Sequence, residues 1–361
     1  MSIWKYKDLL IDLPPAMQVS LGEGSTPLVR SRGIGPKHGL KNLLFKIESS
    51  NPTGSYKDRF AAAAISDMLA NGRSRCIATS SGNTGSALAA YCAVAQIDCR
   101  IVIVETTPTS KLKQMLCYGA RLARVKGFGL DSAITANTME QLKKSTGPDS
   151  QIQISAFAYS PHGMSGVQTI SYELCNQMPA GIDHVFSPAG GGGLTLAVAR
   201  GFALLVDRGI LAKSPAIECV QPQGNDTIAS SLRGGCNRAR EVVCTSQISG
   251  LQVPNVIDGD HVIAMCRASG GSGHTVSDEE AWAAQTMLSN EEGLLCEPAA
   301  ATALAGALRA RAEGKLNPDA TIICLVTGAG FKDPVSIDRM IGDRGCPAID
   351  LSELRNWLET R

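Results

Sequence analysis

Short apolar runs of strand length alternate along the chain with longer stretches of helix length, and this alternation restricts the fold more than any other feature. The strand-like runs cover residues 76–78, 101–104, 185–186, 216–220 and 322–326. The helix-like stretches cover residues 61–70, 85–95, 111–117, 131–144, 194–206, 278–288 and 299–311. Buried strands that alternate with helices are typical of βαβ units. The sequence therefore predicts an α/β fold with open, mostly parallel sheets.

Length and charge exclude several classes of protein. The 361 residues suffice for two domains, at about 150 residues per domain. The 34 basic and 33 acidic side chains leave a net charge of +1, whereas nucleic-acid and acidic-membrane binders carry a basic excess. The apolar runs are too short to span a bilayer, and the first residues lack the apolar segment of an export signal. We expect a cytoplasmic protein with neither a nucleic-acid nor a membrane partner.

The twelve cysteines follow no metal-binding or redox pattern. No pair has the Cys-x-x-Cys spacing, and the nearest pairs are Cys92 with Cys99 and Cys236 with Cys244. Most lie in apolar contexts, where a free cysteine behaves as a small buried hydrophobe. We expect reduced structural thiols, as in a reducing compartment, and no metal site.

A run of four glycines lies between a strand-like run and a helix-like stretch, at residues 190–193. Such a loop lets backbone N–H groups converge at a helix N-terminus, where an anion binds. It lacks the lysine of a P-loop and the spacing of a dinucleotide fingerprint. The loop therefore suggests a phosphate other than that of ATP or NAD, although a tight turn alone also explains it.

Lys57 follows a run of turn residues and directly precedes a stretch rich in alanine. A lysine in this position is usually a solvated surface residue. The positive end of a helix disfavours an ammonium group and lowers its pKa, which makes the amine nucleophilic enough for a Schiff base. Both interpretations remain open from this segment alone.

Two further polar segments follow strand-like runs. Residues 79–85, TSSGNTG, place hydroxyls and an amide at the start of a helix, where they bind a carboxylate or simply cap the helix. Thr327 and two glycines follow the strand-like run 322–326. Ligands in open α/β sheets bind outside the carboxyl ends of the strands, so these segments are expected to meet.

Together the four segments resemble the fold-type II family of pyridoxal-phosphate enzymes, and within it the threonine synthase branch. Residues 21–28, LGEGSTPL, are similar to the LGEGxTPL that opens that branch, and residues 52–59, PTGSYKDR, to its PTGSxKDR, whose lysine carries the cofactor. Residues 81–84 resemble the asparagine loop and residues 327–333 the TGxGxKD signature. The resemblance covers residues 21–334 and implies a tryptophan synthase β-like fold, with two domains and a cofactor cleft between them.

The resemblance implies a role for each matching residue. Lys57 forms the Schiff base with pyridoxal 5′-phosphate and then acts as the general base at Cα, and Asn83 hydrogen-bonds the 3-oxygen of the cofactor ring. Thr327 faces the pyridine nitrogen, where a hydroxyl stabilises a pyridinium less than a carboxylate does and favours rapid loss of a leaving group. The cofactor phosphate is held by the backbone amides of Gly190, Gly191, Gly192, Gly193 and Leu194, and the substrate carboxylate by Ser80, Ser81, Asn83 and Thr84.

The chain departs from the threonine synthase pattern in two places. Threonine synthases carry a stretch like NSxNPxR that holds the phosphate of O-phosphohomoserine, and the matching residues here are 157–163, FAYSPHG. Phe157, Ala158 and Gly163 lack the charge-assisted donors that a dianion needs, and His162 becomes a candidate for substrate recognition. The glycine loop is also closer to that of dehydratases and β-replacement enzymes. Arg59 and Lys111 are further candidates for binding an anionic side chain of the substrate. The alternative for Arg59 is a structural ion pair with Asp58 or Glu48, and the alternative for Lys111 is a solvated surface position.

The sequence therefore predicts elimination or replacement on an amino acid with a leaving group at Cβ or Cγ, with a serine-type substrate favoured. Authentic threonine synthase activity is the alternative within enzymes, and a non-catalytic protein that binds pyridoxal phosphate is the alternative outside them. Residues 1–60 with 158–361 are expected to form the large cofactor-binding domain, and residues 61–157 a small mobile domain. The resemblance also implies a homodimer.

Overall fold

The computed structural model describes residues 2–80 and 82–359 and contains two sheets. The larger sheet has the strand order β1-β2-β10-β7-β8-β9, in which β1 pairs antiparallel with β2 and the other neighbours are parallel. The smaller sheet has the order β5-β4-β3-β6 and is parallel throughout. The larger sheet consists of β1 (Leu28–Arg30), β2 (Asn42–Ile47), β7 (His184–Pro188), β8 (Ala216–Pro222), β9 (Gly273–Val276) and β10 (Thr321–Val326), and the smaller of β3 (Arg75–Thr79), β4 (Asp98–Ile103), β5 (Arg121–Arg124) and β6 (Ser150–Ile152). The α/β prediction with mostly parallel sheets is confirmed.

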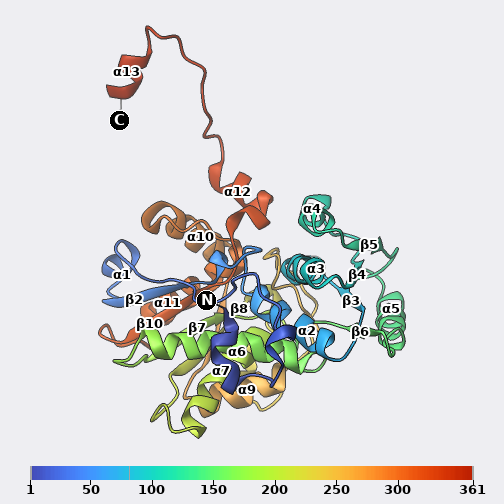
Figure 1. Cartoon of the computed structure of the whole chain (residues 1–361). Helices are drawn as coiled ribbons and strands as arrows, with labels where there is room; N and C mark the ends of the chain where they lie inside the picture. Colours follow the sequence, from blue (N-terminus) through green and yellow to red (C-terminus); the bar gives the residue numbers. More distant parts are fainter. Residues whose placement is uncertain (1, 81, 360–361) are drawn as a thin grey trace.

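Helices cover both faces of the larger sheet, as expected for parallel strands. Alternate residues of β10 show this arrangement, because Ile323 and Leu325 belong to the core that α6 and α7 share, and Ile322 and Cys324 to the core on the α11 side. Figure 1 shows the smaller sheet with α3, α4 and α5 to one side of the molecule. The α-helices are α1 (Ile34–Lys37), α2 (Lys57–Ala70), α3 (Asn83–Ala95), α4 (Thr109–Cys117), α5 (Ser132–Lys144), α6 (Pro161–Gln177), α7 (Gly193–Asp207), α8 (Ala229–Arg233), α9 (Gly259–Ala268), α10 (Asp278–Glu292), α11 (Pro298–Ala312), α12 (Pro334–Ile341) and α13 (Leu354–Glu359), and the 3-10 helices are η1 (Ile3–Leu9), η2 (Pro15–Met17), η3 (Glu48–Ser50), η4 (Gln223–Asn225) and η5 (Gly330–Lys332).

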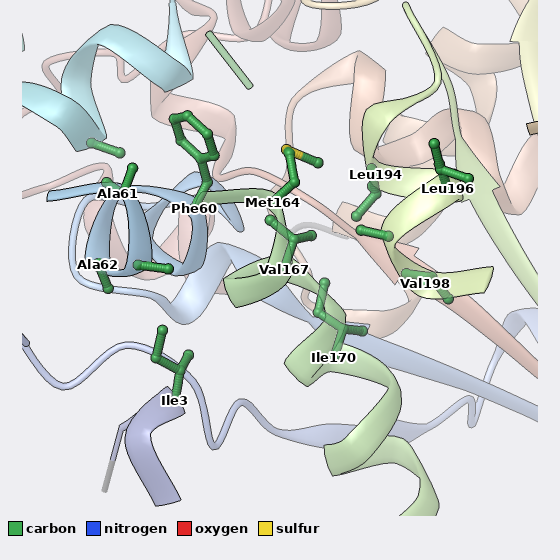
Figure 2. Packing of buried hydrophobic residues seen from close by; sticks show 14 of the residues in the cluster. Ile3, Phe60, Ala61, Ala62, Met164, Val167, Ile170, Leu194, Leu196 and Val198 are labelled. Carbon is green, nitrogen blue, oxygen red and sulfur yellow. The ribbon is translucent and has the colours of Figure 1, made fainter. Parts of the chain in front are cut away.

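The main core lies where α2, α6 and α7 pack together. Figure 2 shows Phe60 of α2 beside Met164 and Val167 of α6, with Leu194 of α7 beyond them. The sequence analysis did not predict α6, because two glycines interrupt its apolar pattern. A Cβ on Gly166 would lie 2.1 Å from the Arg59 carbonyl oxygen. The glycine is therefore required by the close approach of α2 and α6.

A buried ionic network anchors the first turn of α2. Arg59 donates to Glu48 and Glu173 at 2.7 Å each, and Lys46 donates to Glu173 at 2.7 Å. All four side chains are at most 1% exposed. Of the two structural partners that were considered for Arg59, the structure shows Glu48. Arg59 therefore fixes the helix that begins at Lys57.

The expected boundary between residues 60 and 61 falls inside α2, which is continuous from Lys57 to Ala70. The strands of the smaller sheet nevertheless all lie within residues 61–157, and those of the larger sheet lie outside that range. Beyond α12 the chain leaves the body of the molecule and ends in α13 (Figure 1). Within the described residues, no helix is both long and apolar enough to cross a membrane.

Candidate functional site

A cavity of about 290 Å³ lies at the carboxyl ends of strands from both sheets. Thr79 ends β3, Pro188 ends β7, and Thr327 directly follows β10; all three line the cavity. Parallel strands place their carboxyl ends at one edge, which is where ligands of α/β folds bind. The predicted meeting of the polar segments at the strand ends is therefore observed.

Lys57 is the first residue of α2 and lines the cavity. Its Nζ donates to the Ser155 Oγ at 2.5 Å and lies 4.5 Å from the centre of the Tyr56 ring. Burial lowers the pKa of Lys57 to about 7, against a smaller opposing effect of Glu297. Loss of hydration, rather than the helix end on which the sequence argument relied, is thus the main cause of the shift. A large fraction of this amine is neutral and nucleophilic near pH 7.

The glycine loop joins β7 to α7 and supplies a cradle of backbone groups. All four glycines and Leu194 line the cavity, and α7 begins at Gly193 with a first turn of uncharged residues. A Cβ on Gly190 would lie 3.1 Å from the Val253 Cγ2 and 3.2 Å from the Leu251 Cα. The loop thus has little room for side chains, and the helix N-terminus behind it favours an anion.

The segment after β3 lines the same cavity through Ser80, Asn83 and Thr84. The Thr84 and Ser155 hydroxyls lie 3.1 Å apart, so Thr84 is linked to Lys57 through Ser155. The Ser80 hydroxyl accepts the Gly85 N–H at 2.9 Å, which is the local capping role that sequence reasoning kept as an alternative. Ser81 lies outside the described residues.

Glu297 is a cavity residue that the sequence analysis missed. It precedes α11, and its two carboxylate oxygens accept the Asn83 Nδ2 at 2.8 and 3.1 Å. Burial raises the pKa of Glu297, and the hydrogen bond from Asn83 opposes that effect. Its backbone N–H donates to the Gly328 carbonyl oxygen at 3.1 Å, which ties it to the segment around Thr327. The only sequence signal for Glu297 was its position directly before a proline at the start of a helix.

Two further lysines line the cavity, Lys111 from α4 and Lys332 from η5. Lys111 Nζ donates to the Ser249 Oγ and lies 3.4 Å from the Asp333 Oδ2. Lys332 Nζ donates to the Thr53 carbonyl oxygen and to the Gln114 Oε1, both at 2.8 Å. Burial lowers the pKa of Lys332. These contacts bind α4 to the segment that follows β10.

The structure does not bring His162 to the cavity. Its side chain is 58% exposed, and its Nδ1 lies 2.9 Å from the Asp67 Oδ1 on α2. The backbone N–H groups of Phe157 and Ala158 instead donate to the Asp258 carboxylate at 2.8 and 3.2 Å. The segment that matches the phosphate-binding stretch of threonine synthases therefore faces a carboxylate.

The structure thus gathers most of the residues that the sequence analysis selected. Ser155, Ser249, Glu297 and Lys332 join them without having been selected. The predicted residues that line the cavity are Lys57, Ser80, Asn83, Thr84, Lys111, Gly190, Gly191, Gly192, Gly193, Leu194 and Thr327.

Comparison with known proteins gives a consistent result. A family model described as "Pyridoxal-phosphate dependent enzyme" matches residues 19–328. Threonine synthase of Methanocaldococcus jannaschii is 31% identical over 338 residues, which are 92% of this chain and 81% of that protein. Threonine synthase of Halalkalibacterium halodurans is 29% identical over 340 residues, 92% of this chain and 91% of that protein.

Solved structures with the same fold include a threonine deaminase from Solanum lycopersicum, with a TM-score of 0.75, 21% identity and coverage of 95% of this chain and 94% of that chain. O-ureido-L-serine synthase with bound O-ureido-L-serine superposes with a TM-score of 0.70 and 21% identity, over 94% of this chain and 97% of that chain. At these identities the likeness concerns the fold alone.

The cavity residues fit pyridoxal phosphate. The aldehyde of this cofactor reacts with a neutral lysine amine, and the lowered pKa of Lys57, about 7, gives it a large neutral fraction. Its phosphate requires backbone donors with no side chains in the way, which the four glycines and the N-terminus of α7 supply. Asn83 and Thr327 offer uncharged polar groups for the ring substituents.

Proposed function

Because the chain belongs to the pyridoxal-phosphate-dependent enzyme family, we propose that it eliminates or replaces a leaving group at Cβ of a serine-type amino acid. Elimination or replacement at Cγ is the wider class that the same site could serve. When bound, the cofactor supplies the electron sink that makes the Cα proton of the substrate acidic. The chain's own residues position the substrate, exclude water and move that proton.

Lys57 is the residue to which we assign covalent attachment of the cofactor and the proton transfer at Cα. A pKa of about 7 gives Lys57 both a populated neutral form to accept a proton and a populated charged form to return it. Ser155 fixes the amine through its 2.5 Å hydrogen bond and connects it to Thr84. The Lys57 amine is therefore pre-oriented by the Ser155 hydroxyl, which Thr84 in turn holds.

The segment after β3 is assigned to the carboxylate of the substrate, with Ser80, Asn83 and Thr84 as its described members. Thr84 lies in the first turn of α3, where the positive end of the helix favours a carboxylate. Asn83 has a second task at the cofactor ring, and Glu297 holds its amide in place. Thr327 is assigned to the pyridine nitrogen, where its uncharged hydroxyl favours loss of a leaving group over prolonged storage of charge.

The observation that carries the preference for a serine-type substrate is the contact of Asp258 with residues 157 and 158. A phosphate dianion bound at these amides would have to displace a carboxylate that already accepts both N–H groups. Of the described cavity residues, none is an arginine or a histidine. A small uncharged substrate side chain therefore suits the cavity better than a second phosphate does.

Authentic threonine synthase activity remains the second candidate, and two observations favour it. The curated relatives at 29–31% identity are threonine synthases. Lys111 and Ser249 also form a cationic and hydroxyl-bearing corner of the cavity, which could hold a phosphate from another side.

The two candidates are separated by product assays on the holoenzyme with O-acetylserine, O-phosphoserine, serine, threonine and O-phosphohomoserine. The proposal expects turnover with a β-substituted serine or with serine itself. Formation of threonine and phosphate from O-phosphohomoserine alone contradicts it and establishes the second candidate. Binding of the cofactor without turnover of any of the five supports a non-catalytic protein.

A matched pair of variants locates the phosphate site if O-phosphohomoserine is the substrate. Lys111→Met then raises KM by about tenfold or more, because it removes a charge-assisted donor. Lys113→Met, on the exposed side of the same helix, leaves KM unchanged. If the substrate is an uncharged serine derivative, both variants keep the wild-type KM.

The arrangement of the molecule beyond the site is also a proposal. The segregation of strands supports a small domain that starts after α2 and ends before α6, with the smaller sheet at its centre. The family resemblance implies a homodimer, which sedimentation analysis of the purified protein tests.

A further inference from the structure

Three cysteines that form no recognisable sequence motif come together at the smaller sheet. Cys76 lies on β3 and Cys99 on β4, and the two are direct partners in the parallel register of these strands. Cys92 lies on α3, which packs against both strands. The three Sγ atoms all lie within 4.8 Å of one another. The fold thus assembles a triangle of thiols that the sequence spacing did not predict.

The triangle is buried and consists of sulfur ligands alone. Cys76 and Cys92 are 0% exposed and Cys99 is 6% exposed. The surrounding cluster includes Ala78 and Leu88. Within residues 2–80 and 82–359, this is the one group of three His, Cys, Asp or Glu residues whose ligand atoms come close enough to hold a metal ion. Because its ligands are all sulfur atoms, the site is a poor match for a hard cation, which prefers oxygen ligands.

The number of sulfurs selects among soft ions. Structural zinc sites have four ligands, and this cluster offers three. Soft thiolates also select Cu(I), which does not need a fourth ligand. Metal–sulfur bonds of about 2.3 Å in a trigonal plane place the sulfurs ~4.0 Å apart. The observed spacing needs only a small contraction to reach that geometry.

We propose that Cys76, Cys92 and Cys99 bind one Cu(I) ion in trigonal coordination. All three sulfurs bind as thiolates, so binding of one Cu(I) ion releases the three thiol protons to solvent and leaves a net charge of −2 at the site. No change of oxidation state is involved.

The location gives the site a structural consequence. β3 ends at Thr79 and α3 begins at Asn83, so two of the three ligands lie on the elements that flank the asparagine loop. An ion at the thiol triangle ties β3, α3 and β4 together behind that loop. The proposal does not depend on the reaction that the enzyme catalyses.

The test is an anaerobic titration of the reduced, full-length holoenzyme with Cu(I), in competition with a chromophoric Cu(I) chelator. X-ray absorption then counts the sulfur ligands. We expect one tightly bound Cu(I) per chain with three sulfur neighbours. Replacing the exposed Cys117, Cys236 and Cys346 by serine should leave both results unchanged. Cys92→Ala should weaken Cu(I) binding by at least about tenfold, since loss of an outer-shell partner alone costs 10–100-fold.

Several results would overturn the proposal. Cu(I) uptake that disappears in the exposed-cysteine variant, or that persists unchanged in Cys92→Ala, places the ion elsewhere. Two sulfur neighbours, or no binding that competes with the chelator, excludes the trigonal site. The visible absorbance of the bound cofactor reports whether Cys92→Ala is folded. If it is not, Cys76→Ala is the second variant, with the same expected loss of binding and the same contradicting result.

Discussion

Replacing Arg59 tests whether the buried ionic network holds the helix that presents Lys57. Arg59 bonds both carboxylate oxygens of Glu48 and of Glu173. In Arg59→Met, Glu173 retains Lys46 at 2.7 Å. Glu48 retains only uncharged partners, Thr26 and Asn51. One buried carboxylate is then left without a cation, which costs about 3–5 kcal/mol.

The assay is urea unfolding at pH 7 with a surface pair as control. Lys41 and Asp319 lie 2.8 Å apart with side chains 67% and 68% exposed. Lys41→Met should therefore cost less than about 1 kcal/mol. Similar costs for the two variants, or a cost below about 1 kcal/mol for Arg59→Met, would refute the argument from burial.

The pH dependence of this difference has a definite sign. Despite burial, Arg59 and Lys46 hold the pKa of Glu173 below its usual range in the folded protein. A carboxyl group with a depressed folded pKa contributes stability above its unfolded pKa and loses it as the pH falls. The gap between wild type and Arg59→Met should therefore narrow below about pH 4.3.

Three further changes probe the site and its support. The rate of pyridoxal phosphate binding to the apoenzyme should rise with pH and level off above about pH 7, because only the neutral Lys57 amine attacks the aldehyde; a rise that continues to pH 10 contradicts the lowered pKa. Gly328→Ala should reduce activity, since its Cβ would lie 2.3 Å from the Glu297 Oε1. Turnover assays measure the effect, with Gly345→Ala as the control because its Cβ meets nothing within 4 Å. Equal activities of the two variants would contradict this prediction. Gly166→Ala should destabilise the fold by about 1–3 kcal/mol in urea unfolding through overpacking of α2 against α6, and a midpoint equal to that of Gly345→Ala would count against this packing argument.

The parts of the fold that sequence could predict are those with a local cause. β10 is a continuous apolar run, and α7 follows a glycine turn, so periodicity and turn residues locate both. The reverse holds for α6, where Gly163 and Gly166 weaken the helical pattern. These glycines are required by the close packing of α6 against α2. A Cβ on Gly163 would lie 2.6 Å from the Cε2 atom of Phe60 on α2. A close approach between helices distant in sequence leaves no local signal.

The site divides in the same way. Lys57, Asn83 and Thr327 lie in motifs whose residue types are unusual enough to indicate chemistry. Glu297 acts through a hydrogen bond to a residue 214 positions away, and Ser155 through one 98 positions away. Sequence spacing holds no information about such partners. The same limit explains the thiol triangle, whose members come from two paired strands and a helix.

His162 shows the converse error. A histidine in the segment that matches a substrate-binding stretch was a reasonable candidate for recognition. Helix α6 begins at Pro161, and the first turn of that helix directs His162 toward Asp67. Because α6 was not predicted, the direction of this side chain could not be predicted either.

The central claim is that Lys57, among the three lysines that line the cavity, carries the cofactor. Borohydride reduction of the holoenzyme makes the lysine–cofactor bond permanent, and peptide mass spectrometry then identifies the modified residue. We predict the modification on Lys57 alone. Modification of Lys111 or Lys332 instead would contradict the assignment and the mechanism built on it.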